Sequence, residues 1–185
     1  MSNTKEVRMG DTYATNSLMQ MTAAGKAISE GMFRKAITVY HQEHPEIFCD
    51  TTNTFRIADF GCADACNSLF IYEHLIELVR EISPGKPIEI LCSDLEKTNW
   101  QKLFENVSGL KQNYDNVFFS VAAGSFYTQI FASSSVDFAF CCTSIHWLSK
   151  APCFIPTYTY HTFEEYPEID AEKVELWRRS TSDDL

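Results

Sequence analysis

Short apolar runs alternate along this chain with longer stretches in which apolar residues recur every three to five positions. The short runs predict four buried strands, at residues 54–60, 88–92, 116–122 and 136–142. The longer stretches predict helices, at residues 16–41, 67–82, 98–107 and 170–179. Apolar strands that alternate with helices are typical of a mostly parallel sheet with both faces covered, so we expect an α/β fold.

Glycine and proline positions refine this pattern. Gly25 and Gly31 lie inside the first helical stretch and mark places where it can break, and Pro45 ends it. Gly61 closes the first strand in a turn. Residues 1–12 are a polar arm.

Length and composition indicate one globular domain. The chain has 185 residues, of which 45% are hydrophobic and 14% aromatic. No apolar run approaches the roughly 18 residues that would span a membrane. The polar start, Met1 to Glu6, is unlike a secretory signal, so we expect a cytoplasmic protein without a membrane partner.

The charge balance argues against nucleic acid as a partner. There are 15 Lys and Arg residues against 25 Asp and Glu residues, which gives a net charge of −10. Binding to a phosphate backbone needs clustered cations, and here Arg178 and Arg179 are the only adjacent basic pair.

The seven cysteines are an odd number in a chain without an export signal, and most lie in apolar stretches. We therefore expect reduced thiols that pack as small hydrophobic groups. Cys62 and Cys66 lack a second pair at ligand spacing, and His74 is too isolated to complete a site, so we expect no metal.

Two acidic residues at or just after the ends of predicted strands carry the candidate chemistry. Asp59 and Gly61 come at the end of the first strand, where ligands of open α/β sheets bind, although a plain tight turn has the same composition. Asp94 follows the second strand and can accept bonds from ribose hydroxyls, or it can cap the next helix. The G-x-G-x-x-G fingerprint is missing, so these carboxylates suggest an adenosine-bearing ligand without a pyrophosphate.

Five segments together resemble the plant SABATH family of S-adenosylmethionine-dependent carboxyl methyltransferases, which act on salicylate, jasmonate and related small acids. They include the patterns Y-A-x-N-S-x-x-Q, G-S-F-Y and S-x-H-W-L-S, and they lie at residues 13–20, 57–67, 93–99, 124–127 and 144–149. The resemblance implies a Rossmann-like class I methyltransferase sheet with strands in the order 3-2-1-4. Family members continue with three further strands and a helical cap. We therefore expect residues 1–185 to form a single, incomplete domain that lacks the later strands, with residues 1–45 as an arm and helix over the donor site.

The resemblance also implies which residues hold S-adenosylmethionine. Those expected at its methionine end or in the loop beside it are Tyr13, Ser17, Asp59, Gly61 and Asn67. Asp94 is expected to bind the ribose, and the residues expected around the adenine are Leu95, Ser125 and Phe126. The residues expected at the acceptor are Gln20, His146 and Trp147. No catalytic residue is expected, because an activated methyl group and an ionised carboxylate need no base.

Blander interpretations stay open for several of these residues. Phe126 and Trp147 can be core aromatics, His146 a structural histidine, and Ser17 and Gln20 surface positions.

The chain also departs from the family pattern. Ala65 replaces a loop glycine and Cys66 a proline, and Thr143 replaces a pocket tyrosine, which bears on the choice of acceptor.

The expected function is methyl transfer from S-adenosylmethionine to the carboxylate of a small organic acid. The alternative is a truncated, non-catalytic methyltransferase-like domain that binds the nucleoside or a protein partner. A nucleotide-binding oxidoreductase is disfavoured by the missing glycines. An edge strand at residues 136–142 would invite association, so a homodimer is also considered.

Overall fold

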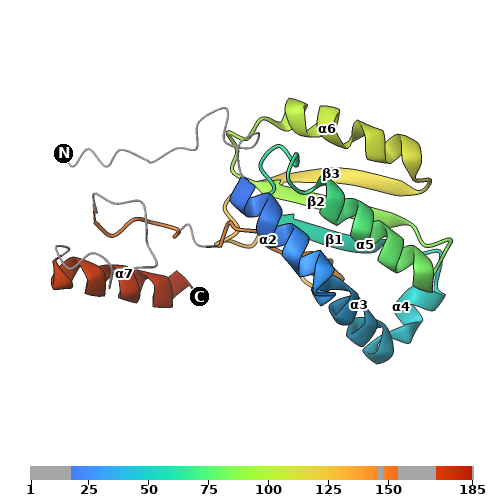
Figure 1. Ribbon diagram of the computed structural model, residues 1–185, viewed down its shortest axis with the longest axis horizontal. Helices are drawn as coiled ribbons and strands as arrows, with labels where there is room; N and C mark the ends of the chain where they lie inside the picture. The colour runs from blue at the N-terminus through green and yellow to red at the C-terminus, as the bar shows by residue number, and fades with distance from the viewer. Residues whose placement is uncertain (1–17, 146–147, 154–169, 185) are drawn as a thin grey trace. The chain divides into compact units, whose positions relative to one another are not determined.

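The computed structural model describes residues 18–145, 148–153 and 170–184, and all that follows on structure concerns these residues (Figure 1). The chain divides into two compact units. The larger is Met9–Ser144, and the smaller combines Met1–Arg8 with Ile145–Leu185.

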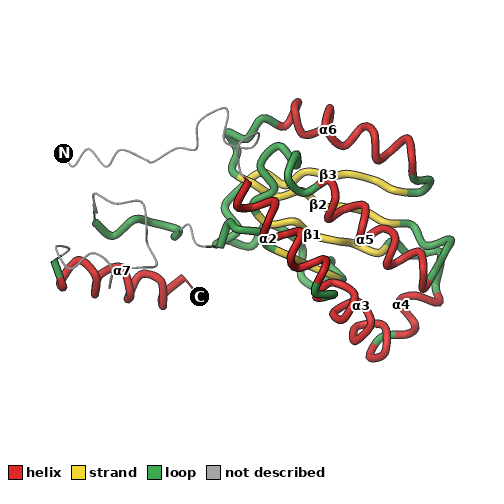
Figure 2. The backbone as a smooth tube through the Cα atoms, viewed as in Figure 1, coloured by secondary structure: helices red, strands yellow, loops and turns green. Residues whose placement is uncertain are grey.

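Four parallel strands form the sheet of the larger unit, in the order β3-β2-β1-β4 (Figure 2). They are β1 (Phe55–Phe60), β2 (Ile88–Asp94), β3 (Val117–Ala123) and β4 (Phe138–Phe140). This arrangement confirms the predicted α/β class and the strand order that the family resemblance implied. The register places Asp59 of β1 beside Cys92 of β2 and Phe140 of β4.

The core lies between this sheet and the helix that follows β1, α5 (Leu69–Ile82). Tyr72 on that helix packs its ring against Phe119 of β3 and Phe140 of β4, at centroid distances of 5.9 and 6.3 Å. The strand residues Ile57 and Ile90 are fully buried. The sequence predicted cover on both faces, but Phe118, which alternates with Phe119 along β3 and so points away from α5, is 49% exposed, and the second face is open there among the described residues.

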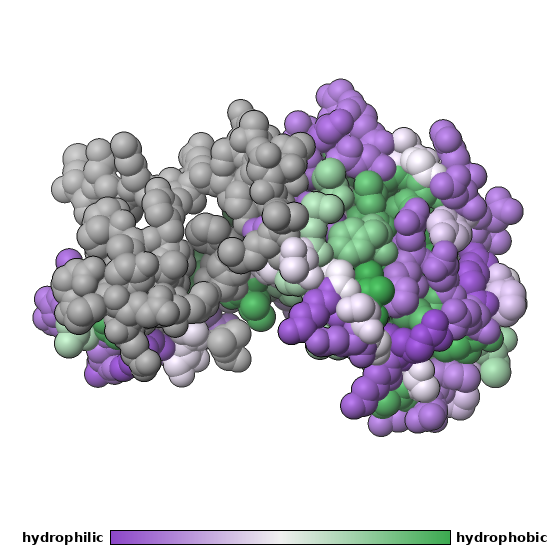
Figure 3. Space-filling view, in the orientation of Figure 1, coloured by the Kyte–Doolittle hydropathy of each residue, from purple (hydrophilic) through white to green (hydrophobic). Residues whose placement is uncertain are grey.

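The first helical stretch breaks into α2 (Leu18–Ser29) and α3 (Met32–Glu43), which lie with α5 over one face of the sheet (Figure 1). Gly31 makes the break, because its backbone is left-handed with φ 70°. Gly25, the other predicted break point, lies inside α2. The outer surfaces of these helices are mostly hydrophilic, with hydrophobic residues between them (Figure 3).

Pro45 ends the α3 pattern, as predicted, and also begins α4 (Pro45–Cys49), which the sequence did not reveal. Proline suits the first turn of a helix, because it has no amide hydrogen to leave unbonded there.

Helix α6 (Trp100–Asn113) runs beside β3 and continues past the predicted end at residue 107 (Figure 1). Its apolar stripe continues through Val107 and Leu110, both buried, and this packing outweighs the low helix propensity of Gly109. The side chain of Asn99 caps its first turn by accepting from Lys102 N at 3.0 Å.

Strand β4 is shorter than the predicted run at 136–142. Within the described part of the chain it pairs with β1 alone, and the Asp137 carboxylate accepts from the backbone N–H of Arg56 at 2.7 Å just before the strand begins. Thr143, just beyond the predicted end, has a left-handed backbone with φ 60°, which is incompatible with an extended strand.

The smaller unit contains α7 (Ala171–Asp184), which confirms the helix predicted from Asp170 onward. Trp177 on this helix is buried, and the Asp184 carboxylate accepts from both the backbone N–H and the hydroxyl of Ser149, at 2.7 and 2.6 Å. No helix in the described part of the chain is long and apolar enough to cross a membrane.

Candidate functional site

The segments that follow β1, β2 and β3 are tied together at the carboxyl edge of the sheet. Gly61 N donates to Ser93 O at 2.8 Å, and Gly124 N donates to Asp94 O at 2.8 Å. Backbone bonds thus bring the three segments predicted to hold the donor, residues 59–67, 93–95 and 124–127, into one cluster, which we call the carboxyl-edge cluster.

Asp94 is at the centre of this cluster. Its Oδ2 accepts from Ala63 N at 2.7 Å, and its Oδ1 accepts from Leu95 N at 2.7 Å and Thr98 Oγ1 at 3.0 Å. A carboxylate offers about four acceptor positions, so these three bonds leave capacity for another donor. The alternative role as helix cap is wrong, because Asn99 caps α6.

Apolar side chains lie in the segments that flank Asp94 or bond to its backbone. The Leu95 side chain is 56% exposed, which is unusual for a leucine directly after a buried strand. The Phe126 ring is half-buried and packs edge-on against Phe60, with centroids 6.4 Å apart. The Ser125 hydroxyl accepts from Tyr127 N at 3.3 Å and shapes the turn that carries Phe126.

Asp59 differs from Asp94, because its carboxylate is almost completely buried, at 1% exposure. Tyr72 donates its hydroxyl hydrogen to Asp59 Oδ2 at 2.7 Å, and the Ser68 hydroxyl is a second donor. Burial raises the pKa of the Asp59 carboxyl to about 6, with a further push from the negative charge of Asp94, while the bonds from Tyr72 and Ser68 oppose the rise. The pKa of the Asp59 carboxyl thus lies well above that of an exposed aspartate.

The loop between β1 and α5 has an uncommon backbone. Gly61, Ala63 and Ala65 have positive φ values of 82°, 49° and 61°, and Ala65 is fully buried. A left-handed backbone is strained for alanine and relaxed for glycine. Ala65, which replaces the family's loop glycine, thus adopts a conformation that glycine would favour. Asn67 is half-buried at the end of this loop.

The predicted acceptor residues are only partly visible. Gln20 lies on the first turns of α2 and is half-buried. The residues that lie outside the described part of the chain are Tyr13, Ser17, His146 and Trp147. Their roles, and that of Gln20, stay predictions.

Sequence reasoning missed three residues in or beside the carboxyl-edge cluster. Tyr72 lies in the helix predicted at 67–82 and has no predicted role, although a tyrosine hydroxyl among apolar positions signals a buried partner. Ser144 lies in a quoted motif but had no role, and its hydroxyl donates to Gly61 O at 3.0 Å. The fully buried Ser93 hydroxyl has no hydrogen-bond partner in the described part of the structure.

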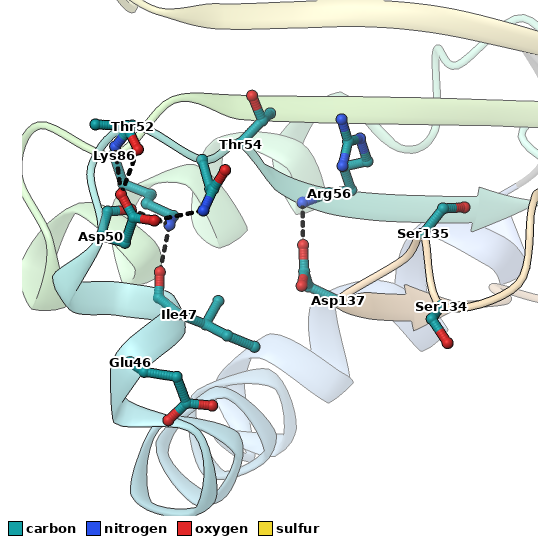
Figure 4. Close-up of a pocket in the computed structure, with 11 residues that line it drawn as sticks. Glu46, Ile47, Asp50, Thr52, Thr54, Arg56, Lys86, Ser134, Ser135 and Asp137 are labelled. Atoms are coloured by element: carbon teal, nitrogen blue, oxygen red, sulfur yellow. Dashed lines mark hydrogen bonds between the residues drawn. The ribbon is translucent and has the colours of Figure 1, made fainter.

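A cavity of about 630 Å³ lies at the opposite, amino end of β1 (Figure 4). The fully buried Lys86 projects into it, and its ammonium group donates to Ile47 O and to Asp50 O, the latter at 2.6 Å. A cation that bonds the last carbonyls of α4 is a structural cap for that helix. We therefore assign this cavity no part in binding the donor.

The cysteines of the structure are reduced, and two of them are buried in the core. Cys62 and Cys92 are buried, and all seven cysteines are free thiols. Among the described residues, no group of three or more His, Cys, Asp or Glu side chains could hold a metal ion.

Comparison with known proteins identifies relatives of this arrangement. A family model described as "SAM dependent carboxyl methyltransferase" matches residues 6–165. Loganic acid O-methyltransferase from Catharanthus roseus is 30% identical over 149 residues, covering 76% of this chain and 38% of that protein. A probable 7-methylxanthine methyltransferase from Theobroma cacao is 35% identical over 104 residues, covering 52% of this chain and 28% of that protein.

A solved structure, loganic acid methyltransferase with SAH, has a TM-score of 0.66 and 29% sequence identity. The match covers 80% of this chain and 42% of that one. The chain thus spans about two-fifths of the length of the loganic acid methyltransferases that it resembles.

Proposed function

We propose, because the chain belongs to the S-adenosylmethionine-dependent carboxyl methyltransferase family, that it serves methyl transfer from S-adenosylmethionine to the carboxylate of a small organic acid. S-adenosylmethionine is the cofactor of this family.

The observation that carries this proposal is the carboxyl-edge cluster itself. Asp94 retains acceptor capacity beside the exposed Leu95, and the half-buried Phe126 lies in a segment whose Gly124 N–H bonds Asp94 O. An adenosine offers ribose hydroxyls, a flat apolar ring and polar ring edges, which fit such groups. The residues present therefore suit the nucleoside part of the cofactor.

We assign the donor contacts by residue. Asp94 accepts from the ribose hydroxyls, and Leu95, Ser125 and Phe126 surround the adenine. Gly61 allows the loop to approach the ligand. The methionine end is held by Tyr13, Ser17, Asp59 and Asn67, with residues 1–45 covering the site.

The cofactor supplies a methyl group activated by a sulfonium. An ionised carboxylate oxygen of the acceptor forms the new O–C bond while the C–S bond breaks and its electron pair stays on sulfur, so no proton moves. The protein's contribution is alignment of the two reactants, worth up to roughly 7–11 kcal/mol in favourable cases. Gln20 and Trp147 are assigned to orient the carboxylate, with His146 lining the pocket.

A binding experiment tests the donor site first. Asp94→Ala should weaken binding of S-adenosylmethionine, measured by calorimetry, by about 1–3 kcal/mol, because it removes a charged acceptor. Asp115→Ala is the matched control, since Asp115 is an exposed aspartate after α6, outside the carboxyl-edge cluster. Equal affinities in the two variants would remove Asp94 from the site.

A transfer assay then tests the reaction. Labelled methyl groups should appear in base-labile esters of acids such as salicylate, jasmonate or loganate. Thr143 replaces the expected pocket tyrosine, so 7-methylxanthine is included to detect transfer to nitrogen.

The second candidate function is a methyltransferase-like domain that binds the nucleoside or a protein partner without turnover. The departures from the family pattern favour it, because Ala65 and Cys66 replace residues of the donor loop and Thr143 replaces a tyrosine of the acceptor pocket. Donor binding without transfer to any acceptor would support it. We further propose a cytoplasmic location, which the free cysteines favour, and a homodimer, which sedimentation would detect.

A further inference from the structure

The hydroxyl of Tyr72 is directed at the carboxylate of Asp59 from within the core. Tyr72 is fully buried, and its O–H donates to Asp59 Oδ2 at 2.7 Å. We propose that Tyr72 is a positioning residue for the methyl donor, which fixes Asp59 as an ionised carboxylate beneath the loop at residues 61–67. This inference rests on the proposed function.

Packing alone does not explain a tyrosine at this position. The ring contacts of Tyr72 with Phe119 and Phe140 would be equally available to phenylalanine. The hydroxyl must find a partner when it is buried, and its neighbours are Asp59 and the sulfur of Cys92 at 3.6 Å. Burial, then the charge of Asp59, raises the pKa of the Tyr72 hydroxyl well above its usual value, so it remains a donor at neutral pH.

The same turn of α5 provides a second donor. Ser68 precedes α5 but makes no side-chain cap bond there, and its hydroxyl instead bonds Asp59. Helix positions 68 and 72 are four residues apart and therefore lie on one face. Two hydroxyl groups on this face thus converge on one buried carboxylate.

The other groups around Asp59 either oppose its ionisation or carry no charge. Asp94, at the end of β2, raises the pKa of Asp59 through its negative charge. The thiols of Cys62, Cys92 and Cys142 surround it, and burial raises the pKa of the Cys142 thiol, which keeps it neutral. With the pKa of Asp59 at about 6, the bonds from Tyr72 and Ser68 are what keep the carboxylate largely ionised at neutral pH.

An ionised carboxylate at this point has a clear use. S-adenosylmethionine carries two cationic groups, a sulfonium and an ammonium, and a buried negative charge beneath the binding loop attracts them strongly. Protonation of Asp59 removes that charge, so donor binding and protonation of Asp59 compete. Loss of the Tyr72 hydroxyl should therefore change the pH at which the donor binds.

Tyr72→Phe tests this directly. Calorimetric binding of S-adenosylmethionine to the full chain is measured from about pH 5.5 to 8. In the unaltered chain half of the affinity should be lost near pH 6, and in Tyr72→Phe this midpoint should rise by about one pH unit, which weakens binding at pH 6 about five-fold. If the Tyr72 hydroxyl serves packing alone, the folded variant will keep the midpoint of the unaltered chain. An unchanged midpoint would therefore overturn the inference.

Tyr40→Phe is the matched control. It also removes a tyrosine hydroxyl that bonds an aspartate, Asp137, but at the amino end of the sheet. Its midpoint should equal that of the unaltered chain.

A second readout needs no donor. Isotope-edited infrared or carbon NMR spectra of Asp59 should show its pKa rise in Tyr72→Phe, and also in Ser68→Ala, which keeps the test available if the tyrosine variant misfolds. Unchanged titration of Asp59 in the folded variants would overturn the inference. If the unaltered chain binds no donor at any pH, the proposed function fails, whereas binding with an unchanged midpoint in both variants contradicts the positioning role alone.

Discussion

Ser144 occupies the space that a side chain on Gly61 would need. The Ser144 hydroxyl donates to Gly61 O at 3.0 Å. A Cβ added to Gly61 would lie only 2.2 Å from Ser144 Oγ. The glycine of the first loop is therefore required by a residue that follows it by 83 positions. The contact joins the loop after β1 to the segment after β4, within the larger unit.

This contact predicts a large effect for Gly61→Ala. The new methyl group would overlap Ser144, and alanine would be strained at φ 82°, so stability should fall by about 2–4 kcal/mol in denaturant unfolding. Ser144→Gly should recover part of the loss in the double variant, because it removes the clash but not the strain. Gly25→Ala is the control, since nothing lies within 4 Å of its added Cβ in α2, and it should stabilise by roughly 0.5–1 kcal/mol. Equal effects at both glycines would contradict the close approach.

Ala63 and Ala65 both have left-handed backbones, but they differ in how far their methyl groups are buried. Ala63→Gly should stabilise the chain by about 0.5–1 kcal/mol, because the φ of 49° is relieved and the lost methyl group is only half-buried. Ala65→Gly should gain less, since its methyl group is fully buried and its loss leaves a void. Thermal unfolding of both variants checks the order. A larger gain at Ala65 than at Ala63 would show that strain outweighs packing there.

Asp59 predicts a pH dependence of stability. Its folded pKa, about 6, is above the usual 3.8, so its stabilising contribution is complete below about pH 4 and is lost as the pH rises through 6. Asp59→Asn, which cannot ionise, should unfold at higher denaturant concentration than the unaltered chain at pH 7–8, by about 1–3 kcal/mol. The difference should shrink toward pH 4. A constant difference across this range would mean that Asp59 does not titrate there.

The position of Lys86 predicts that a change at the amino end of the sheet alters stability without altering donor affinity at the carboxyl end. Lys86→Met removes the ammonium group that bonds Ile47 O and Asp50 O, which leaves two partly buried carbonyls without this donor, and should destabilise by about 1–3 kcal/mol. Affinity for S-adenosylmethionine at a temperature where the variant is folded should not change, because the lysine lies at the amino end of the sheet. Weaker donor binding in the folded variant would show that the cavity influences the site.

The strands and most helices could be predicted from local patterns, because their apolar periodicity reflects burial on one or both faces. Local signals failed where a tertiary contact decided the boundary. Asp137 bonds to the strand residue Arg56 and precedes a short β4, and continued packing of Leu110 carries α6 past its predicted end. Strand order came from the family resemblance, since periodicity contains no information on which strands are neighbours.

In the candidate site, too, some residues could be predicted from local patterns and others depend on tertiary contacts. Asp59 and Asp94 could be proposed because strand ends of a parallel sheet share one edge. Tyr72 and Ser144 could not, because each acts through a partner brought near only by the fold. Sequence reasoning treated Asp59 and Asp94 alike, yet one is buried with hydroxyl partners and the other binds loop amides.

The bond between Asp94 and Ala63 N has a consequence for how a nucleoside would be received. The carboxylate assigned to the ribose already holds the loop in the unliganded chain, so the entropy of ordering that loop is lost during folding rather than on association. A ligand would meet a preformed cradle, and its arrival rate would be set by diffusion rather than by loop rearrangement. Stability and affinity are then coupled through one side chain, and substitutions at Asp94 should alter both together.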